Sequence, residues 1–458
     1  MASPQKKART EASDKKIEGK QQLRDSGKYR YMTGWQTYAQ TEVLDGALPA
    51  LGNTPQKCPY GLYAEQINGT SFTKVKHANL RTWFYRIRPS AAVKHDWKPL
   101  PSAEYDVSQT PSVVTPESRR WKPLPMPKKP TNFVQGLHCY CGAGAAEAKA
   151  GIRCHVYACN QSMTDCSFSN SDGDMLIVPQ VGTLDIKTEC GLMEVPSGYI
   201  CVIQRGIKFS VNVPKEGARG YVCEVFDGHF ETPPLGVIGA NGLSNLKDFE
   251  TPVAWYEDKD CKWTHYQKFN ENMFQVSIDH SPFDVVAWSG NYAPFRYDLA
   301  KYCVINTVSY DHLDPSIFCV ITAQTAEPGV ASCDFVIFPP RWMVASSTFR
   351  PPYYHLNTMS EFMGNIAGTY EAKPDGGFQP GGATLHSPMT PHGPAVEVFE
   401  KHSSVELKPQ PPMEDHLAFM FESTYMMKLT PFARDNLVDK NYTDCWKGFK
   451  KNFDPRAK

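Results

Sequence analysis

The sequence has no excess of charge of one sign and no long hydrophobic run. Its 458 residues include 48 basic and 48 acidic side chains, so the formal net charge is zero. Proteins that bind nucleic acid or an anionic membrane surface usually carry an excess of lysine and arginine, so neither partner is expected. No apolar run approaches about 18 residues, and the N-terminus MASPQKKARTEASDKK has no apolar segment, so neither a membrane span nor a secretory signal is expected. We therefore expect a cytoplasmic protein.

Paired cysteine motifs and nucleotide-binding glycine motifs are also missing. The 14 cysteines are scattered irregularly from Cys58 to Cys445, and without a secretory signal they are expected to be reduced, mostly buried thiols. The densest group is Cys139, Cys141, Cys154, His155 and Cys159. It lacks the C-x2-C spacing of structural zinc sites, so core thiols are the preferred interpretation and zinc the minor alternative. The sequence contains no G-x-G-x-x-G motif, so nothing in it indicates a nucleotide cosubstrate.

Turn-forming residues are abundant. The chain has 37 prolines and 32 glycines, with 41% hydrophobic and 21% charged residues, a balance typical of a turn-rich globular protein. Within residues 131–300, short runs such as TLDIKT and IKFSVNV alternate with period 2 between glycine, proline and asparagine. Further short apolar runs lie at 301–310, 316–325, 333–340 and 416–430. This pattern predicts an all-β fold, a sandwich or barrel, and disfavours βαβ units.

The two ends of the chain differ from this pattern. Residues 1–28 are rich in Lys, Gln, Ser and Asp and nearly free of large apolar groups, which predicts a disordered basic tail. A nuclear or anionic-surface tag is the less favoured interpretation of its lysines. Near the other end, apolar residues recur at roughly helical spacing, which predicts a short C-terminal helix packed on the β core. These residues are Leu437, Tyr442, Trp446, Phe449 and Phe453.

The stretch FRPPYYHLNTMSEFMG, residues 349–364, places His355 and Glu361 six positions apart. On a straight strand they would share a face but lie roughly 20 Å apart, too far for one metal ion. On a helix they would point in different directions, and the double proline disfavours regular helix at His355. A bend at Leu356 to Thr358 would bring both side chains together, and Asn357 and Thr358 suit a turn.

A second histidine pair lies downstream in PGGATLHSPMTPHGP, residues 380–394. His386 and His392 are again six apart, and the prolines between them forbid a continuous helix. Two histidines and one carboxylate with open positions form the facial triad of non-haem Fe(II) oxygenases. The residues alone offer His355, Glu361 and either His386 or His392. The alternative is a set of hydrogen-bonded structural histidines, with Glu361 as a salt-bridge partner.

Long motifs over nearly the whole chain after the tail are shared with one known family. They include CPYGLYAEQINGTSFT, FVQGLHCYCGAG, NSDGDMLIVPQ, FVIFPPRW, FRPPYYH, MSEFMG and LHSPMTPHGP. With these motifs the sequence resembles the homogentisate 1,2-dioxygenases, ring-cleaving enzymes of tyrosine and phenylalanine breakdown. The resemblance implies an N-terminal β-sandwich-like domain, a C-terminal cupin-type jelly roll that holds one Fe(II), and a homo-oligomer, a trimer or a hexamer of two trimers.

The composition pattern and the family resemblance together predict the domain boundaries. Residues 1–28 would be the tail, and residues 29–300 the N-terminal β domain with its proline-rich straps. Residues 301–430 would be the iron-binding cupin domain, and residues 431–458 a helical extension.

The resemblance also implies roles for single residues. His355, Glu361 and His392 match the metal ligands, His312 in YDHLDPSIF matches the catalytic base, and Tyr370 and His392 match substrate-binding positions. His386 would then support a ligand or line the pocket. The expected partners are an aromatic small molecule and O2, and both oxygen atoms would be inserted into homogentisate to give maleylacetoacetate.

Three positions depart from the family pattern. Ser289 stands where a histidine is expected, and Leu356 and Ala367 stand where basic residues are expected. If they border the site, a related dioxygenase for a different para-diphenol acid is the alternative function. If they are remote, they leave the substrate unchanged. A non-catalytic cupin metal-binding protein is a third possibility, but such a protein would need neither His312 nor Tyr370.

Overall fold

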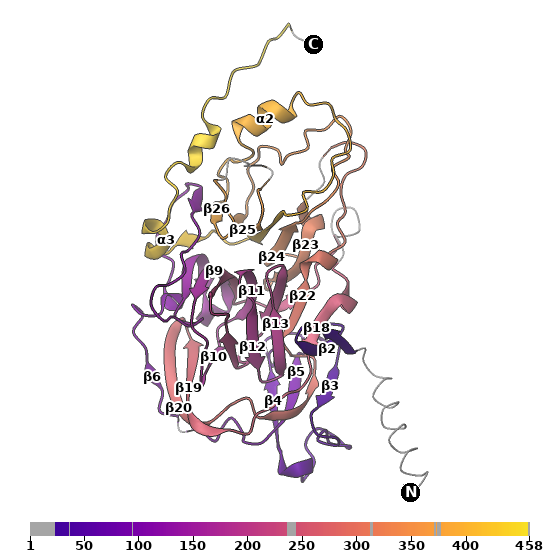
Figure 1. The fold of residues 1–458 in the computed structure, drawn as a ribbon, viewed down its shortest axis with the longest axis vertical. Coiled ribbons are helices and arrows are strands. Elements are labelled where there is room, and N and C mark those ends of the chain that lie inside the picture. The colour runs from indigo at the N-terminus through magenta and orange to yellow at the C-terminus, as the bar shows by residue number, and fades with distance from the viewer. Residues whose placement is uncertain are drawn as a thin grey trace.

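The computed structural model describes residues 23–35, 37–93, 95–235, 244–311, 315–370, 372 and 377–456. Figure 1 shows an elongated molecule built almost entirely of β-strands, with the C-terminal segment at one end. In the described part of the chain, α-helix is confined to α2 (Val396–His402) and α3 (Pro431–Asp435). None of the described helices has the length and apolar character needed to cross a membrane. The predicted all-β fold class is confirmed.

The described strands form four sheets. The largest has the order β1 (Leu23–Ser26), β2 (Tyr29–Thr33), β18 (Phe249–Pro252), β22 (Phe295–Asp298), β14 (Tyr199–Ile203), β11 (Asp174–Val181), β16 (Ala218–Val225), β9 (Ala150–Cys159), β8 (Leu137–Ala145) and β28 (Lys428–Leu429). A second sheet has the order β13 (Gly191–Val195), β12 (Leu184–Thr188), β15 (Phe209–Asn212), β10 (Cys166–Asn170), β19 (Asp260–Phe269), β20 (Asn272–His280) and β6 (Lys98–Pro99).

The third sheet carries the candidate site, and we call it the site sheet. Its order is β17 (Phe230–Glu231), β23 (Cys319–Gln324), β24 (Ala331–Phe338), β27 (Leu417–Ser423), β25 (Ser360–Ala367), β26 (Ala383–His386) and β7 (Arg119–Trp121). The smallest sheet has the order β3 (Ala39–Glu42), β21 (Val285–Gly290), β5 (Arg81–Arg86) and β4 (Tyr63–Asn68).

The largest sheet is the middle layer of the molecule. On β11, Leu176 and Val178 belong to the core that also contains Phe335, Phe362 and Phe419 of the site sheet. Their neighbours Met175 and Ile177 belong to the core shared with the second sheet. Because side chains alternate along a strand, a strand that is buried on both faces needs an unbroken apolar run, and MLIV provides one.

The N-terminal and C-terminal halves of the chain exchange strands. β7 comes from the N-terminal half of the chain but pairs with β26 in the site sheet. β28 comes from the C-terminal half but pairs with β8 in the largest sheet. The site sheet is therefore held at its edge by a segment far away in sequence.

Some local predictions were wrong. Residues 23–26 form β1, paired with β2, so the expected disorder of residues 1–28 does not extend to that segment, and residues 1–22 lie outside the described residues. The apolar run at 301–310 forms no strand, and within it the side chain of Asn306 bonds the amide of Thr307 and the carbonyl of Trp342. All 14 cysteines are free thiols, as expected.

The C-terminal segment has the predicted short helix but not along the whole apolar pattern. α3 ends at Asp435, and Leu437 has a positive φ of 58°, which interrupts the helix. Beyond it, only the turn Tyr442–Trp446 is helical, of the 3-10 type. Leu437 packs on the core, whereas Tyr442, Trp446 and Phe449 contact residues around the site.

Candidate metal centre

An isolated backbone bridge places His355 beside His392. The amide of His355 donates to the carbonyl of His392 at 3.0 Å, and the amide of His392 donates back at 3.2 Å. Such reciprocal pairing puts both side chains on the same side of the bridge. The two ring centroids are 4.2 Å apart.

Glu361 meets both histidines from the start of β25. Its Oε2 lies 2.9 Å from Nε2 of His392, and its Oε1 lies 3.6 Å from Nε2 of His355. The chain between His355 and Glu361 bends, and the bend is held by Asn357, whose Nδ2 donates to Oε1 of Glu361 at 2.5 Å. The carbonyl of Asn357 also accepts from the amide of Met389 at 2.7 Å. The predicted convergence of His355 and Glu361 is therefore present.

These three side chains offer one donor atom each within 4.8 Å of one another, and we call them the metal centre. Glu361 and His392 are buried, with side chains 5% exposed, whereas His355 is 28% exposed and leaves the centre open on its side. Burial alone would raise the pKa of Glu361, but the neighbouring imidazoles of His355, His386 and His392 lower it well below its usual range. The carboxylate is therefore ionised at neutral pH.

The outer nitrogens of both ligand histidines are already used. Nδ1 of His355 lies 2.8 Å from the carbonyl of Tyr353, and Nδ1 of His392 lies 2.9 Å from the carbonyl of Thr390. A carbonyl only accepts, so Nδ1 carries the proton and Nε2 of the neutral ring presents a lone pair. Nε2 of His392 makes no hydrogen bond although Oε2 of Glu361 is close. Two lone pairs and a carboxylate facing one another fit a divalent metal ion, which would replace protons that otherwise balance the charge.

His386 is opposite Glu361 in the pairing of β25 with β26. Its Nδ1 lies 3.1 Å from Oε2 of Glu361, and its Nε2 lies 2.6 Å from the hydroxyl of Tyr442. Its ring stacks on that of His392, with centroids 4.1 Å apart. Both nitrogens of His386 are therefore engaged, which leaves His392 as the third candidate ligand.

Two further predicted site residues have different outcomes. Tyr370 is 7% exposed and packs in an aromatic cluster, with its ring 6.2 Å from Phe338, 5.7 Å from Phe378 and 5.8 Å from His416. His312 lies outside the described residues.

The three departures from the family pattern lie at different places. Ser289 is on β21, between β3 and β5, and accepts a hydrogen bond from Gln40 at 3.1 Å. In Figure 1, β3 and β5 lie in the lower part of the molecule, whereas β25 and β26 lie in its upper half. Ala367 ends β25, six residues and roughly 20 Å beyond Glu361. Of the three departures, Leu356, which is 58% exposed, is the one that directly follows a candidate ligand, His355.

Two residues at the site had no functional interpretation from the sequence. Asn357 was expected only to permit the bend, yet its amide also bonds the ligand carboxylate. Tyr442 was expected only on the face of a terminal helix, yet it bonds His386, which is 56 residues away in sequence. No local pattern signals such a contact.

Family models match nearly the whole chain. The model described as homogentisate 1,2-dioxygenase N-terminal matches residues 30–299, and the model described as homogentisate 1,2-dioxygenase C-terminal matches residues 300–453.

Relatives of this kind come from distant organisms. The homogentisate 1,2-dioxygenase of Dictyostelium discoideum is 53% identical over 428 residues, covering 93% of this chain and 98% of that protein. The human homogentisate 1,2-dioxygenase is 50% identical over 441 residues, covering 94% of this chain and 98% of that protein. A solved Bacillus subtilis oxalate decarboxylase variant is 13% identical, covers 80% of this chain and 97% of that chain, and has a TM-score of 0.29, too low a similarity to add to what the strands show.

Proposed function

Because this chain belongs to the homogentisate 1,2-dioxygenase family, we propose that it cleaves the ring of homogentisate with O2 and produces maleylacetoacetate. The observation that carries the proposal is the convergence of His355, Glu361 and His392 in a chain that resembles these enzymes over almost its full length. The bond that opens joins the ring carbon bearing the acetate arm to its hydroxylated neighbour. Both atoms of O2 enter the product, so no reducing cosubstrate is needed.

The metal in this proposal is Fe(II). Two imidazoles and one carboxylate leave several coordination positions open, the donor set typical of non-haem Fe(II) oxygenases. When bound, the ion would supply a Lewis-acidic, redox-active position where the phenolic substrate and O2 meet. The carbonyls that hold Nδ1 of His355 and of His392 would keep both rings turned toward the ion.

The remaining roles are assigned to groups around the centre. His312 would take the proton from a ring hydroxyl of the substrate. An imidazole suits this role of general base because it can accept and release a proton near neutral pH. Tyr370 would donate a hydrogen bond to the substrate. His392 would border the substrate as well as hold the metal.

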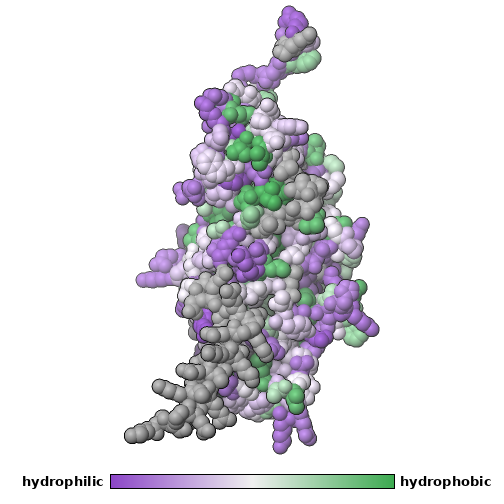
Figure 2. All heavy atoms as spheres, turned by 90° about the vertical axis from the view of Figure 1, so that its right-hand side faces the viewer, coloured by the Kyte–Doolittle hydropathy of each residue, from purple (hydrophilic) through white to green (hydrophobic). Residues whose placement is uncertain are grey.

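We further propose a cytoplasmic homo-oligomer, a trimer or a hexamer, acting in tyrosine and phenylalanine breakdown. Large apolar side chains are exposed in the C-terminal half, among them Tyr310, which is 71% exposed, and Trp342, which is 54% exposed. Figure 2 shows apolar side chains gathered on the upper half of one face. Contiguous exposed apolar surface is typical of subunit interfaces, and sedimentation of the purified protein measures the assembly.

The proposed reaction is tested by anaerobic purification, reconstitution with Fe(II) and measurement of O2 consumption with homogentisate, followed by identification of the product. Gentisate and homoprotocatechuate serve as comparison substrates. His312→Ala should keep its iron and lower kcat by about 10²–10⁴-fold. Unchanged kcat would remove His312 from the role of base, and no O2 uptake with homogentisate by the iron-loaded chain would contradict the proposed reaction.

A further inference from the structure

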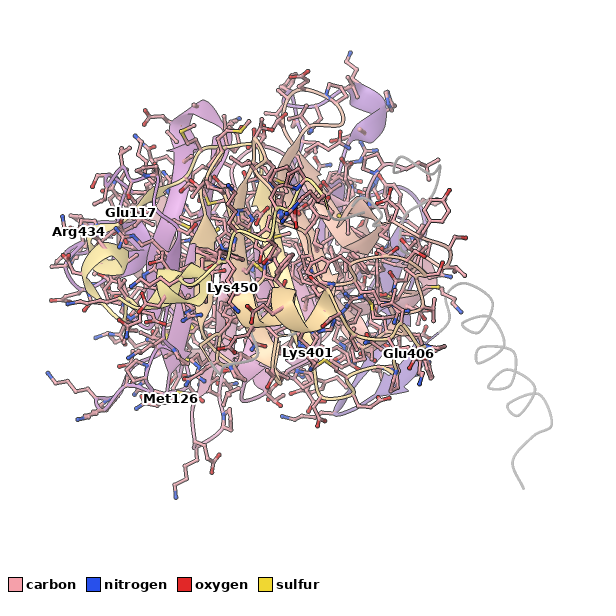
Figure 3. The ribbon with its side chains drawn as sticks, turned by 90° about the horizontal axis from the view of Figure 1, so that it is seen from above. Glu117, Met126, Lys401, Glu406, Arg434 and Lys450 are labelled. Atoms are coloured by element: carbon pink, nitrogen blue, oxygen red, sulfur yellow. The ribbon has the colours of Figure 1, made fainter. Side chains whose placement is uncertain are left out.

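One segment near the C-terminus contacts residues next to His355 and His392, and also His386, which bonds Glu361. We call residues 436–450 the C-terminal strap. It follows α3, contains the turn Tyr442–Trp446 and ends beside α2, where Nζ of Lys450 lies 3.0 Å from Oε1 of Glu400. Seen from above, Lys450 lies near the middle of the molecule, close to α2 with its labelled Lys401 (Figure 3).

Two contacts of the strap fall next to ligand histidines. Nε1 of Trp446 donates to the carbonyl of Gly393, the residue after His392, at 3.2 Å. The ring of Phe449 packs on Tyr354, the residue before His355, with centroids 5.5 Å apart. Because the bridge is antiparallel, Tyr354 and Gly393 lie next to each other, so the strap contacts both chain segments on one side of the His355–His392 pair.

The third contact of the strap is the hydrogen bond between Tyr442 and His386, and the chemistry of Glu361 determines which of the two groups donates. The carboxylate of Glu361 only accepts, so Nδ1 of His386 must donate to it, across 3.1 Å. Nε2 of the neutral ring then accepts, so the hydroxyl of Tyr442 donates to it across 2.6 Å. The chain of hydrogen bonds runs from Tyr442 through His386 to Oε2 of Glu361, and it fixes the tautomer and the plane of His386.

Tyr442 is itself held in place. It is 2% exposed, and the guanidinium of Arg120 lies 4.7 Å from the centroid of its ring. Arg120 forms a two-nitrogen ion pair with Asp439 of the strap, at 2.9 and 2.6 Å. The amide of Asp439 also donates to the carbonyl of Arg120 at 2.8 Å. Because Arg120 is on β7, the strap is anchored to the edge of the same sheet that carries Glu361.

We propose that the C-terminal strap positions the metal centre, with Tyr442 as a positioning residue that acts through His386 on the carboxylate of Glu361. The inference rests on the proposed function, because it requires that a metal binds at His355, Glu361 and His392. Partners that orient a ligand commonly change metal affinity by about 10–100-fold when removed. The strap would thus determine how tightly the ion is held without contacting it.

The test uses the purified full-length chain loaded anaerobically with Fe(II), and it measures metal loss to a competing chelator. Tyr442→Phe and His386→Leu should each hold the ion about 10–100-fold more weakly. The visible spectrum of the Co(II)-loaded variants should change in both, which a purely structural defect would not produce. In the double variant the loss should equal that of His386→Leu alone, because Tyr442 acts only through His386. His386→Gln should recover most of the affinity, since its amide both accepts and donates.

The matched control is Lys450→Met, which removes an exposed ion pair of the same strap and should leave metal affinity unchanged. Equal affinity in Tyr442→Phe and the unchanged chain would overturn the inference, as would additive losses in the double variant. If Tyr442→Phe fails to fold, the comparison of His386→Leu with His386→Gln decides. An unchanged chain that binds no Fe(II) would contradict the proposed function instead, so the two failures are distinguishable.

Discussion

Two buried polar clusters of this molecule each contain a glutamate beside histidine, but the charge of the glutamate is balanced differently. In the middle layer, Glu224 accepts from Nζ of Lys268 at 2.7 Å and lies 3.1 Å from Nε2 of His155. Lys268 also contacts Asp172 at 3.0 Å, and all these side chains are at most 4% exposed. At the metal centre, the described partners of Glu361 are Asn357 and three histidines, with no lysine or arginine.

The difference separates a structural ion cluster from a candidate metal site. Burial by itself would raise the pKa of Glu224, but Lys268 and His155 outweigh it and lower that pKa. The pKa of Glu361 is also lowered, but by the imidazoles of His355, His386 and His392. The outer nitrogens of His355 and His392 bond carbonyls, and that of His386 bonds the hydroxyl of Tyr442. A buried carboxylate that lacks a permanent cation needs one from outside, because an uncompensated buried charge is costly.

The largest expected effect is at the metal centre. Glu361→Ala should lower the iron content from about one ion per chain to nearly none, because two imidazoles alone bind Fe(II) weakly. Elemental analysis after anaerobic loading measures the content, and circular dichroism checks the fold. Glu224→Gln is the control, and it should keep its iron. Full iron occupancy in Glu361→Ala would remove that residue from the centre.

The next effect concerns the cluster in the middle layer. Lys268→Met should lower the free energy of unfolding by about 3–5 kcal/mol, because Asp172 and Glu224 stay buried without their cation. Iron content should not change. Denaturant unfolding followed by tryptophan fluorescence measures the loss, and adding Glu224→Gln should restore part of it. A Lys268→Met chain as stable as the unchanged protein would mean that water reaches these carboxylates.

His265 in the second sheet is a buried histidine without a carboxylate partner among the described residues, and we expect it to make the stability of the fold depend on pH. Both nitrogens of His265 face serine hydroxyls, at 2.9 Å from Ser167 and 3.0 Å from Ser169, and burial, with a smaller contribution from Lys208, lowers its pKa to about 3. Below its ordinary pKa of about 6.5 the unfolded chain binds a proton that the folded chain does not, so stability falls as pH drops toward 3.

The expected loss from His265 is about 1.4 kcal/mol per pH unit across that window. His265→Gln should flatten the dependence, measured as unfolding midpoints between pH 7 and 4. The same slope in both proteins would show that other groups cause the acid sensitivity.

The smallest effect is expected beside the centre. Leu356 is exposed next to His355, where the family pattern has a basic residue. Leu356→Arg should lower KM for homogentisate by no more than about tenfold, since an exposed ion pair with the acetate group contributes about 1 kcal/mol or less. Ala367→Arg is the matched control at the far end of β25 and should leave KM unchanged. An equal change in KM in both variants would mean that added positive charge acts non-specifically, whatever its position.

Several features followed from the sequence because they depend on local chemistry. The turn-rich composition and period-2 runs predicted an all-β fold, and TLDIKT became β12. The double proline before His355 correctly excluded helix there, and the bend at Asn357 followed from its turn preference. The apolar pattern from Leu437 to Phe453 wrongly predicted a helix along its whole length, because helical spacing does not show which parts of the fold a segment contacts.

The sequence also offered a candidate donor set of two imidazoles and one carboxylate, because ligand chemistry depends on residue type. Residue patterns alone left His386 and His392 as equal candidates. The fold separates them: the bridge to His355 brings His392 into the centre, while Tyr442 engages the second nitrogen of His386. That contact joins residues 56 positions apart, and only the tertiary arrangement of the strap over the site sheet brings them within hydrogen-bonding distance.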